Sequence, residues 1–141
     1  MNHPIEKLQK AMRHAMEIRP KVGGFPYLAE ALRMAGVLKN IWTLPSCQSI
    51  YLMKEGNVVS QSSSIVAGFA EIPRFDKEAL IRALRDDQEG RSIFPEFLNR
   101  AWQAGVIRYE VDFEKRNVAY YGANGEIYVE DYPPVEVRSI F

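Results

Sequence analysis

The sequence predicts an α+β fold that is a tandem duplication of an α-α-β-β-β unit, with antiparallel strands and the helices packed on one face of the sheet. Three observations lead to this prediction. Apolar residues recur at helical spacing in four segments, they alternate with polar residues in the segments that follow each helix pair, and Pro and Gly mark the boundaries. An apolar period that changes from helical spacing to alternation is typical of a helix followed by a strand.

Two helices are expected at the start of the chain. Pro4 stands in the first turn of the first helix, and Asn2 or His3 can act as its cap. The apolar stripe of this helix consists of Ile5, Leu8, Met12, Ala15 and Met16. Pro20 and the pair Gly23-Gly24 end the helix, and Pro26 begins the second one.

Three strands are expected next, because the apolar period changes to two after Gly36. Pro45-Ser46 and Glu55-Gly56 are turn sequences that separate these strands. The serine-rich run 60–64 favours an edge strand or a loop. The segment Ile65–Ile72 fits either a loop or a short strand.

The second half is expected to have the same order. Asp76 is predicted to cap a third helix that ends at Gly90, and a fourth helix begins at Pro95. The next segment alternates most clearly, with apolar residues at Ile107, Tyr109, Val111 and Phe113. Lys115-Arg116 and Asn124-Gly125 are predicted two-residue turns, and the second is typical of a type I′ hairpin.

The two halves match at a constant offset of 69 positions, at which Phe25-Pro26 corresponds to Phe94-Pro95. The glycine that ends each of these helices recurs at the same offset. We interpret the match as an internal repeat with copies at 1–66 and 70–132, within a single domain over 1–141. The alternative is a chance match, because helices that begin with Pro and end with Gly are common.

Composition limits the kinds of partner. The 141 residues are 47% hydrophobic and 26% charged, which is enough for an ordinary core. The 18 Lys and Arg residues balance 18 Asp and Glu residues. Binding to nucleic acid or to an anionic membrane surface relies on excess positive charge, so we expect neither partner. We also expect no cofactor, since no cofactor motif or metal-ligand spacing is recognisable.

The sequence favours a cytoplasmic location. Cys47 is the only cysteine, so the chain cannot form an internal disulfide, and a lone thiol is typical of a reducing compartment. The first residues, Met1–Lys7, lack the apolar stretch of a signal peptide. The longest apolar run, Ile65–Ala70, is much shorter than a membrane span, which needs about 20 residues.

Several short motifs resemble those of a known family. They are Gly23-Gly24-Phe25-Pro26-Tyr27-Leu28, Pro45-Ser46-Cys47-Gln48-Ser49, Asp87-Gln88-Glu89-Gly90, Ala104-Gly105-Val106, Tyr109-Glu110-Val111-Asp112, Tyr120-Tyr121-Gly122 and Tyr128-Val129-Glu130-Asp131-Tyr132. With these motifs, spread over nearly the whole chain, the sequence resembles an uncharacterised family of small bacterial and prophage-encoded proteins, often labelled phage envelope protein. The resemblance implies no established activity, cofactor or catalytic residue.

Cys47 is the one strong nucleophile and a candidate ligand-binding residue. Cysteine catalysis needs a thiolate, and therefore a nearby base or a helix N-terminus that lowers the thiol pKa. The only histidines, His3 and His14, lie on the first expected helix, and nothing in the sequence brings them to Cys47. We interpret Cys47 as a small side chain packed in the core, with catalysis as the alternative.

Acidic and tyrosine side chains gather in the last three expected strands. With two-residue turns on both sides of the middle strand, one face of the sheet carries Glu110, Asp112, Tyr121, Tyr128 and Glu130. Such carboxylates can act as acid and base, or bind a hard cation. We interpret them as a solvated face, predict no metal site, and keep these residues as candidates for ligand binding.

The same register, transferred by 69 positions, puts four aliphatic residues on the matching face of the first half: Ile41, Ile50, Leu52 and Val59. A solvated sheet face does not normally carry four such side chains. We therefore expect this face to be covered by the segment Ile65–Ile72, by the tail Val135–Phe141, or by a second molecule in a homodimer.

These observations favour a non-enzymatic module that binds a protein partner or itself, an accessory protein of bacterial or prophage origin. The alternative is a small-molecule-binding protein or minor enzyme with its site between the two repeats.

Overall fold

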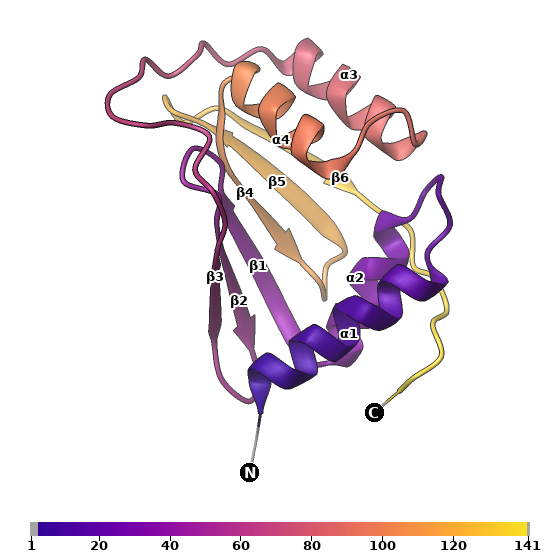
Figure 1. Ribbon diagram of the computed structural model, residues 1–141. Coiled ribbons are helices and arrows are strands. Elements are labelled where there is room, and N and C mark those ends of the chain that lie inside the picture. Colours follow the sequence, from indigo (N-terminus) through magenta and orange to yellow (C-terminus); the bar gives the residue numbers. More distant parts are fainter. Residues whose placement is uncertain (1–2, 141) are drawn as a thin grey trace.

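The computed structural model describes residues 3–140, which form four helices and six strands (Figure 1). The helices are α1 (Pro4–Ile18), α2 (Phe25–Met34), α3 (Lys77–Gln88) and α4 (Phe94–Gln103). The strands are β1 (Val37–Thr43), β2 (Gln48–Met53), β3 (Val58–Gln61), β4 (Val106–Asp112), β5 (Asn117–Gly122) and β6 (Ile127–Asp131). Two helices precede three strands in each half, which confirms the predicted α+β fold class.

The helices begin where the local signals predict. Pro lies in the first turn of α1, α2 and α4. Helix α3 is capped by Asp76, whose Oδ1 accepts a hydrogen bond of 3.0 Å from the backbone N–H of Ala79. His3 is the cap residue of α1 but makes no capping hydrogen bond with its side chain, and Asn2 lies outside the described residues. No helix within residues 3–140 is both long and apolar enough to span a bilayer.

The six strands form one antiparallel sheet in the order β3-β2-β1-β4-β5-β6. The first strands of the two halves, β1 and β4, hydrogen-bond to each other at its centre. All four helices lie on one side of the sheet (Figure 1), where α1 packs on α2 and α3 packs on α4. The other side of the sheet carries no helix from the described part of the chain.

The elements of the two halves keep the offset of 69 residues. It relates α2 to α4, β1 to β4 and β2 to β5, with the same bounds. The first strand of each half has a bulge at the equivalent place, between Val37 and Lys39 and between Val106 and Arg108. The first helices differ, since α1 has 15 residues and α3 has 12. These correspondences support the internal repeat, which remains a prediction.

The core lies between the helices and the sheet. Its fully buried side chains include Val37, Leu44, Leu80, Val106, Val111 and Phe113. A row of aromatic rings crosses the helix side of the sheet. The ring centroids are 6.2 Å apart for Trp42 and Tyr109, 5.7 Å for Tyr109 and Tyr120, and 6.3 Å for Tyr120 and Tyr128. Each such pair adds about 0.5–1.5 kcal/mol beyond the burial of its area.

The turn between β4 and β5 is longer than predicted. Asp112 pairs with Asn117, so residues 113–116 connect the strands, and the two-residue turn predicted at Lys115-Arg116 is wrong. Val111 therefore pairs with Val118. A shift of two residues changes the partners but leaves each side chain on its predicted face, because side chains alternate with a period of two.

The pairing of β5 with β6 differs by one residue from the prediction, and this difference changes the faces. Tyr128 pairs with Tyr120, whereas the sequence predicts a pairing with Tyr121. The whole of β6 is thereby turned over, so Tyr128 and Glu130 lie on the helix side of the sheet. The cause is the turn: the backbone and side chain of Glu126 accept hydrogen bonds from the backbone N–H groups of residues 122 and 124, and these bonds extend it.

The long segment between β3 and α3 contains no strand, so the alternative of a short strand in Ile65–Ile72 is wrong. Its first part folds back onto the turn between β1 and β2, where the N–H groups of Ser62 and Ile65 donate to the carbonyl oxygens of Cys47 and Pro45 over 3.1 and 2.9 Å. From there the segment passes along one end of the sheet to α3 (Figure 1).

The C-terminal tail runs along α1 and α2. The ring of Tyr132 meets Phe25 of α2 edge-on, with centroids 5.2 Å apart. The carbonyl oxygen of Arg138 lies 3.1 Å from Nε2 of His14 on α1. The tail therefore packs on the helix side of the molecule, away from the side of the sheet that carries no helix.

Candidate functional site

The side of the sheet opposite the helices, which we call the open face, carries three rows of side chains. The middle row consists of Val59, Ile50, Ile41, Glu110, Ala119 and Val129. A second row consists of Gln61, Gln48, Thr43, Arg108, Tyr121 and Ile127. The third consists of Leu52, Lys39, Asp112, Asn117 and Asp131.

Four aliphatic residues form an apolar block on one half of the open face. Ile41 pairs with Ile50, and Ile50 pairs with Val59 across the strands. Leu52 lies two residues beyond Ile50 and therefore on the same face. Val59 is 61% exposed, whereas the other three are partly buried by their neighbours in the sheet. The four residues share one face, as the sequence predicts, and their role as an interface remains a prediction.

A polar group lies next to the apolar block. The guanidinium carbon of Arg108 is 4.0 Å from the centre of the Tyr121 ring, and its Nε is 3.8 Å from Oε2 of Glu110. Burial, and then the hydrogen bond with Glu110, raises the pKa of Tyr121. Two predicted ligand-binding residues, Glu110 and Tyr121, therefore lie together, and Arg108 already contacts both.

Asp112 holds the turn between β4 and β5. Its Oδ1 accepts hydrogen bonds from the backbone N–H groups of Glu114 and Lys115, over 3.1 and 3.0 Å. In the neighbouring strand β1, Lys39 lies directly opposite Asp112. The central strands of the open face thus carry charges of both signs.

The other two predicted ligand-binding residues of this group, Tyr128 and Glu130, belong to a contact between β6 and α3. Both carboxylate oxygens of Glu130 accept from Arg85, over 3.1 and 2.6 Å. Gln88 and the Tyr128 hydroxyl also donate to this carboxylate, over 3.2 and 2.5 Å. Burial alone raises the pKa of Glu130, but these hydrogen bonds outweigh it, and the pKa lies below its usual value. The arrangement fastens an edge strand to a helix.

Cys47 is a buried residue of the turn between β1 and β2. Its Sγ donates to the carbonyl oxygen of Leu44 over 3.4 Å, and its backbone φ of 55° lies in the left-handed region. His14, on α1, contacts the C-terminal tail and not Cys47. The structure therefore supports the interpretation of Cys47 as a packed side chain.

Asp87 is a polar residue that lies outside every site predicted from the sequence. It lies two helical turns after Leu80 on the inward side of α3, where Leu80 is fully buried. Burial raises the pKa of Asp87, and the charge of Arg19 partly opposes this. Burial also raises the pKa of Tyr109 and Tyr120, and the charge of Asp87 contributes to both. The signal in the sequence is a carboxylate that continues the apolar stripe of a helix.

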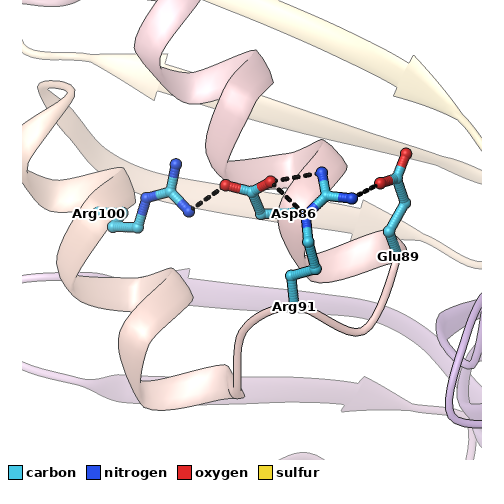
Figure 2. A network of polar contacts seen from close by, with 4 residues as sticks. All are labelled: Asp86, Glu89, Arg91 and Arg100. Carbon is cyan, nitrogen blue, oxygen red and sulfur yellow. Dashed lines mark hydrogen bonds and ion pairs between the residues drawn. The ribbon is translucent and has the colours of Figure 1, made fainter.

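Surface ion pairs connect the end of α3 to α4 (Figure 2). Asp86 accepts from Arg100 over 2.7 Å and from Arg91 over 2.7 and 3.0 Å, and Arg91 also pairs with Glu89. Hydrogen bonds from Arg100 and then Arg91 lower the pKa of Asp86. These paired charges hold the connection between the helices. Within residues 3–140, no three His, Cys, Asp or Glu side chains are grouped to hold a metal ion.

Comparison with known proteins gives the chain its family. Residues 13–131 match the model of a family described as protein of unknown function (DUF1398). An uncharacterized protein of Mycobacterium bovis is 49% identical over 136 residues, which are 96% of this chain and 83% of the relative. An uncharacterized protein of Mycobacterium tuberculosis matches with the same identity and coverage. The chain therefore belongs to the DUF1398 family.

Proposed function

We propose that this protein is a non-enzymatic module that binds another protein molecule through the open face of its sheet. We further propose that it acts in the cytoplasm as an accessory protein of bacterial or prophage origin. The observation that carries the proposal is the apolar block of Ile41, Ile50, Leu52 and Val59 on a face that carries no helix from residues 3–140.

The composition of the open face supports protein binding more than it supports solvation. Along an antiparallel strand, a solvated face normally carries the polar residues of the alternation. Here two of the three residues that β2 places on this face, Ile50 and Leu52, are aliphatic, and Val59 on the edge strand is 61% exposed. Charged residues of the central strands, such as Lys39 and Glu110, border the apolar block, and apolar surface bordered by polar groups is common in protein interfaces.

Neighbouring residues of β3 provide the test. Val59 lies on the open face, whereas the next residue, Ser60, pairs with Ser49 and points to the opposite side. A photo-crosslinking amino acid is introduced at either position of the full chain, in cells of the organism that encodes it. Irradiation is expected to give a discrete adduct from position 59, identified by mass spectrometry, and no adduct from position 60. Equal labelling from both positions, or none from either, would refute the proposal.

Asp87 favours the second candidate function, a small-molecule site between the two halves. A half-buried carboxylate costs stability, and pKa values raised by burial are typical of functional sites. The hydroxyl groups of Tyr109 and Tyr120 are polar groups in the same part of the core. A thermal-shift screen with metabolites tests this function, and it is expected to give ligands whose effect disappears in Asp87→Asn.

A further inference from the structure

We infer that the partner of the open face is a second copy of this chain, in a symmetric dimer whose two-fold axis runs along the boundary between β1 and β4. The inference rests on the proposed function, since it names the partner for the same face. It is carried by the order of residues on the face, by the charge of the chain and by the area that the face offers.

The order of residues on the face is complementary to itself about this axis. Rotation about the β1–β4 boundary exchanges β1 with β4, β2 with β5 and β3 with β6 of the two copies. Lys39 of each copy then faces Asp112 of the partner subunit, because the two residues occupy the same row. In the middle row, Ile50 faces Ala119 of the partner subunit, and Val59 faces Val129 of the partner subunit. Ile50 and Val59 thus meet apolar side chains, and the opposite charges of Lys39 and Asp112 meet.

A two-fold axis perpendicular to the strands instead places one pair of like charges together. A two-fold axis perpendicular to the strands along the middle row would bring Glu110 against Glu110 of the partner subunit. Like charges placed opposite each other in an interface are unfavourable. Rotation about the β1–β4 boundary places Glu110 against Ile41 of the partner subunit, with Arg108 still beside it.

Charge and area also favour a second copy. Lys and Arg number 18, and so do Asp and Glu, so two copies do not repel each other through net charge. Six strands spaced at 4.8 Å and three rows of side chains give the face roughly 600 Å². Two copies would bury about 1,200 Å², at the lower end of the range for specific interfaces. The dimer is therefore expected to dissociate on dilution.

Light scattering after gel filtration gives the first test, over a dilution series. Wild-type protein is expected to have twice the monomer mass of 16.2 kDa. On dilution, its measured mass is expected to fall toward the monomer mass. Val59→Glu is expected to stay monomeric, because the interface would bury an unpaired charge. The matched control, Ser60→Glu, adds the same charge to the opposite side of β3 and is expected to remain a dimer. Val59 and Ser60 are exposed, so neither change should disturb folding, which circular dichroism checks.

Crosslinking tests the axis. In a Cys47→Ser background, a Val59→Cys chain is mixed with a Val129→Cys chain and treated with a short bismaleimide. The two positions lie on opposite edge strands of one chain, so a bond between them joins two copies. The mixture is expected to give a linked dimer of the two chains in preference to either chain linked to itself. A linked dimer formed from two Val59→Cys chains, without the Val129→Cys chain, would overturn the proposed axis.

The outcomes separate this inference from the proposed function. A monomeric wild-type protein whose position 59 crosslinks to a different protein would overturn the dimer and leave the proposed function standing. A monomer with no adduct from position 59 would overturn both. Dimers that persist in Val59→Glu would mean that the chain associates through another surface, which also overturns the inference.

Discussion

Cys47 and Arg116 have the same left-handed backbone conformation, with φ of 55° each, and they lie 69 positions apart. Each is the last residue of the turn that joins the first two strands of its half. Residues other than glycine rarely adopt this conformation, because Cβ approaches the following carbonyl group. The turn therefore keeps an unusual geometry in both halves with two unrelated side chains.

The strain at this turn is measurable at Arg116, whose conformation is unfavourable for a branched side chain. Arg116→Val is expected to lower the free energy of unfolding by about 1–2 kcal/mol, since a β-branched residue tolerates the left-handed region least. Arg116→Gly is expected to cost much less. The control is Lys115→Val in the same turn, where φ is not positive. Urea denaturation checks the three variants, and equal losses for the two valine variants would contradict the prediction.

Cys47 is expected to contribute to stability through packing. Cys47→Ser should lower the free energy of unfolding by about 1–2 kcal/mol, because a more polar group replaces a buried thiol. In the native protein, the thiol is expected to react with a thiol reagent only as fast as the chain opens. Rapid reaction of the folded protein, followed by absorbance, would show that Cys47 is accessible and that a reactive role must be reconsidered.

Glu130 should stabilise the attachment of β6 to α3. Glu130→Ala is expected to cost about 1–2 kcal/mol, less than a fully buried group would, because the side chain of Arg85 is 47% exposed. The control is Asp131→Ala, one residue along on the open face. The folded pKa of Glu130 is lowered, so its contribution is complete above the unfolded pKa and disappears as the pH falls through the folded value. The difference between wild type and Glu130→Gln should therefore shrink below about pH 4.

Adjacent acids at the end of α3 should respond in opposite ways. Burial raises the folded pKa of Asp87. The contribution of Asp87 to stability is therefore most favourable below the unfolded pKa, where the group is protonated, and it is lost as the pH rises through the folded pKa. Asp87→Asn is therefore expected to stabilise the protein at pH 7, by up to about 1 kcal/mol because the carboxylate is half exposed. Asp86→Asn is expected to destabilise it at pH 7, since Arg100 and Arg91 lower the pKa of Asp86. Thermal unfolding at pH 7 and pH 3 checks both, and a loss in Asp87→Asn would indicate an unseen partner.

The starts of the helices can be predicted from the sequence because their causes are local. Pro4, Pro26 and Pro95 fix the first turn of a helix, and Asp76 caps α3 with its own side chain. The alternation after Gly105 correctly predicts that Tyr109 and Val111 of β4 are buried, whereas the bulge buries Val106 in place of the predicted Ile107. The placing of the apolar block also follows from alternation, because β1, β2 and β3 keep the predicted faces.

The pairing of Tyr128 shows where local signals are insufficient. A two-residue turn at Asn124-Gly125 is a reasonable expectation, but hydrogen bonds to Glu126 extend the turn by one residue. One residue is half of the strand period, so Tyr128 and Glu130 move from the open face to the helix side. The predicted acidic cluster is divided for this reason alone.

The sequence by itself determines that this protein has four helices, hairpins after each helix pair and an aliphatic surface on β1 to β3, because each depends on residues a few positions apart. Only the tertiary structure decides that β1 pairs with β4, that Glu130 is bound by Arg85, and that the buried side of α3 ends in Asp87 above a row of tyrosines. These contacts join residues far apart in the chain, and their geometry depends on how the helices and the sheet pack together.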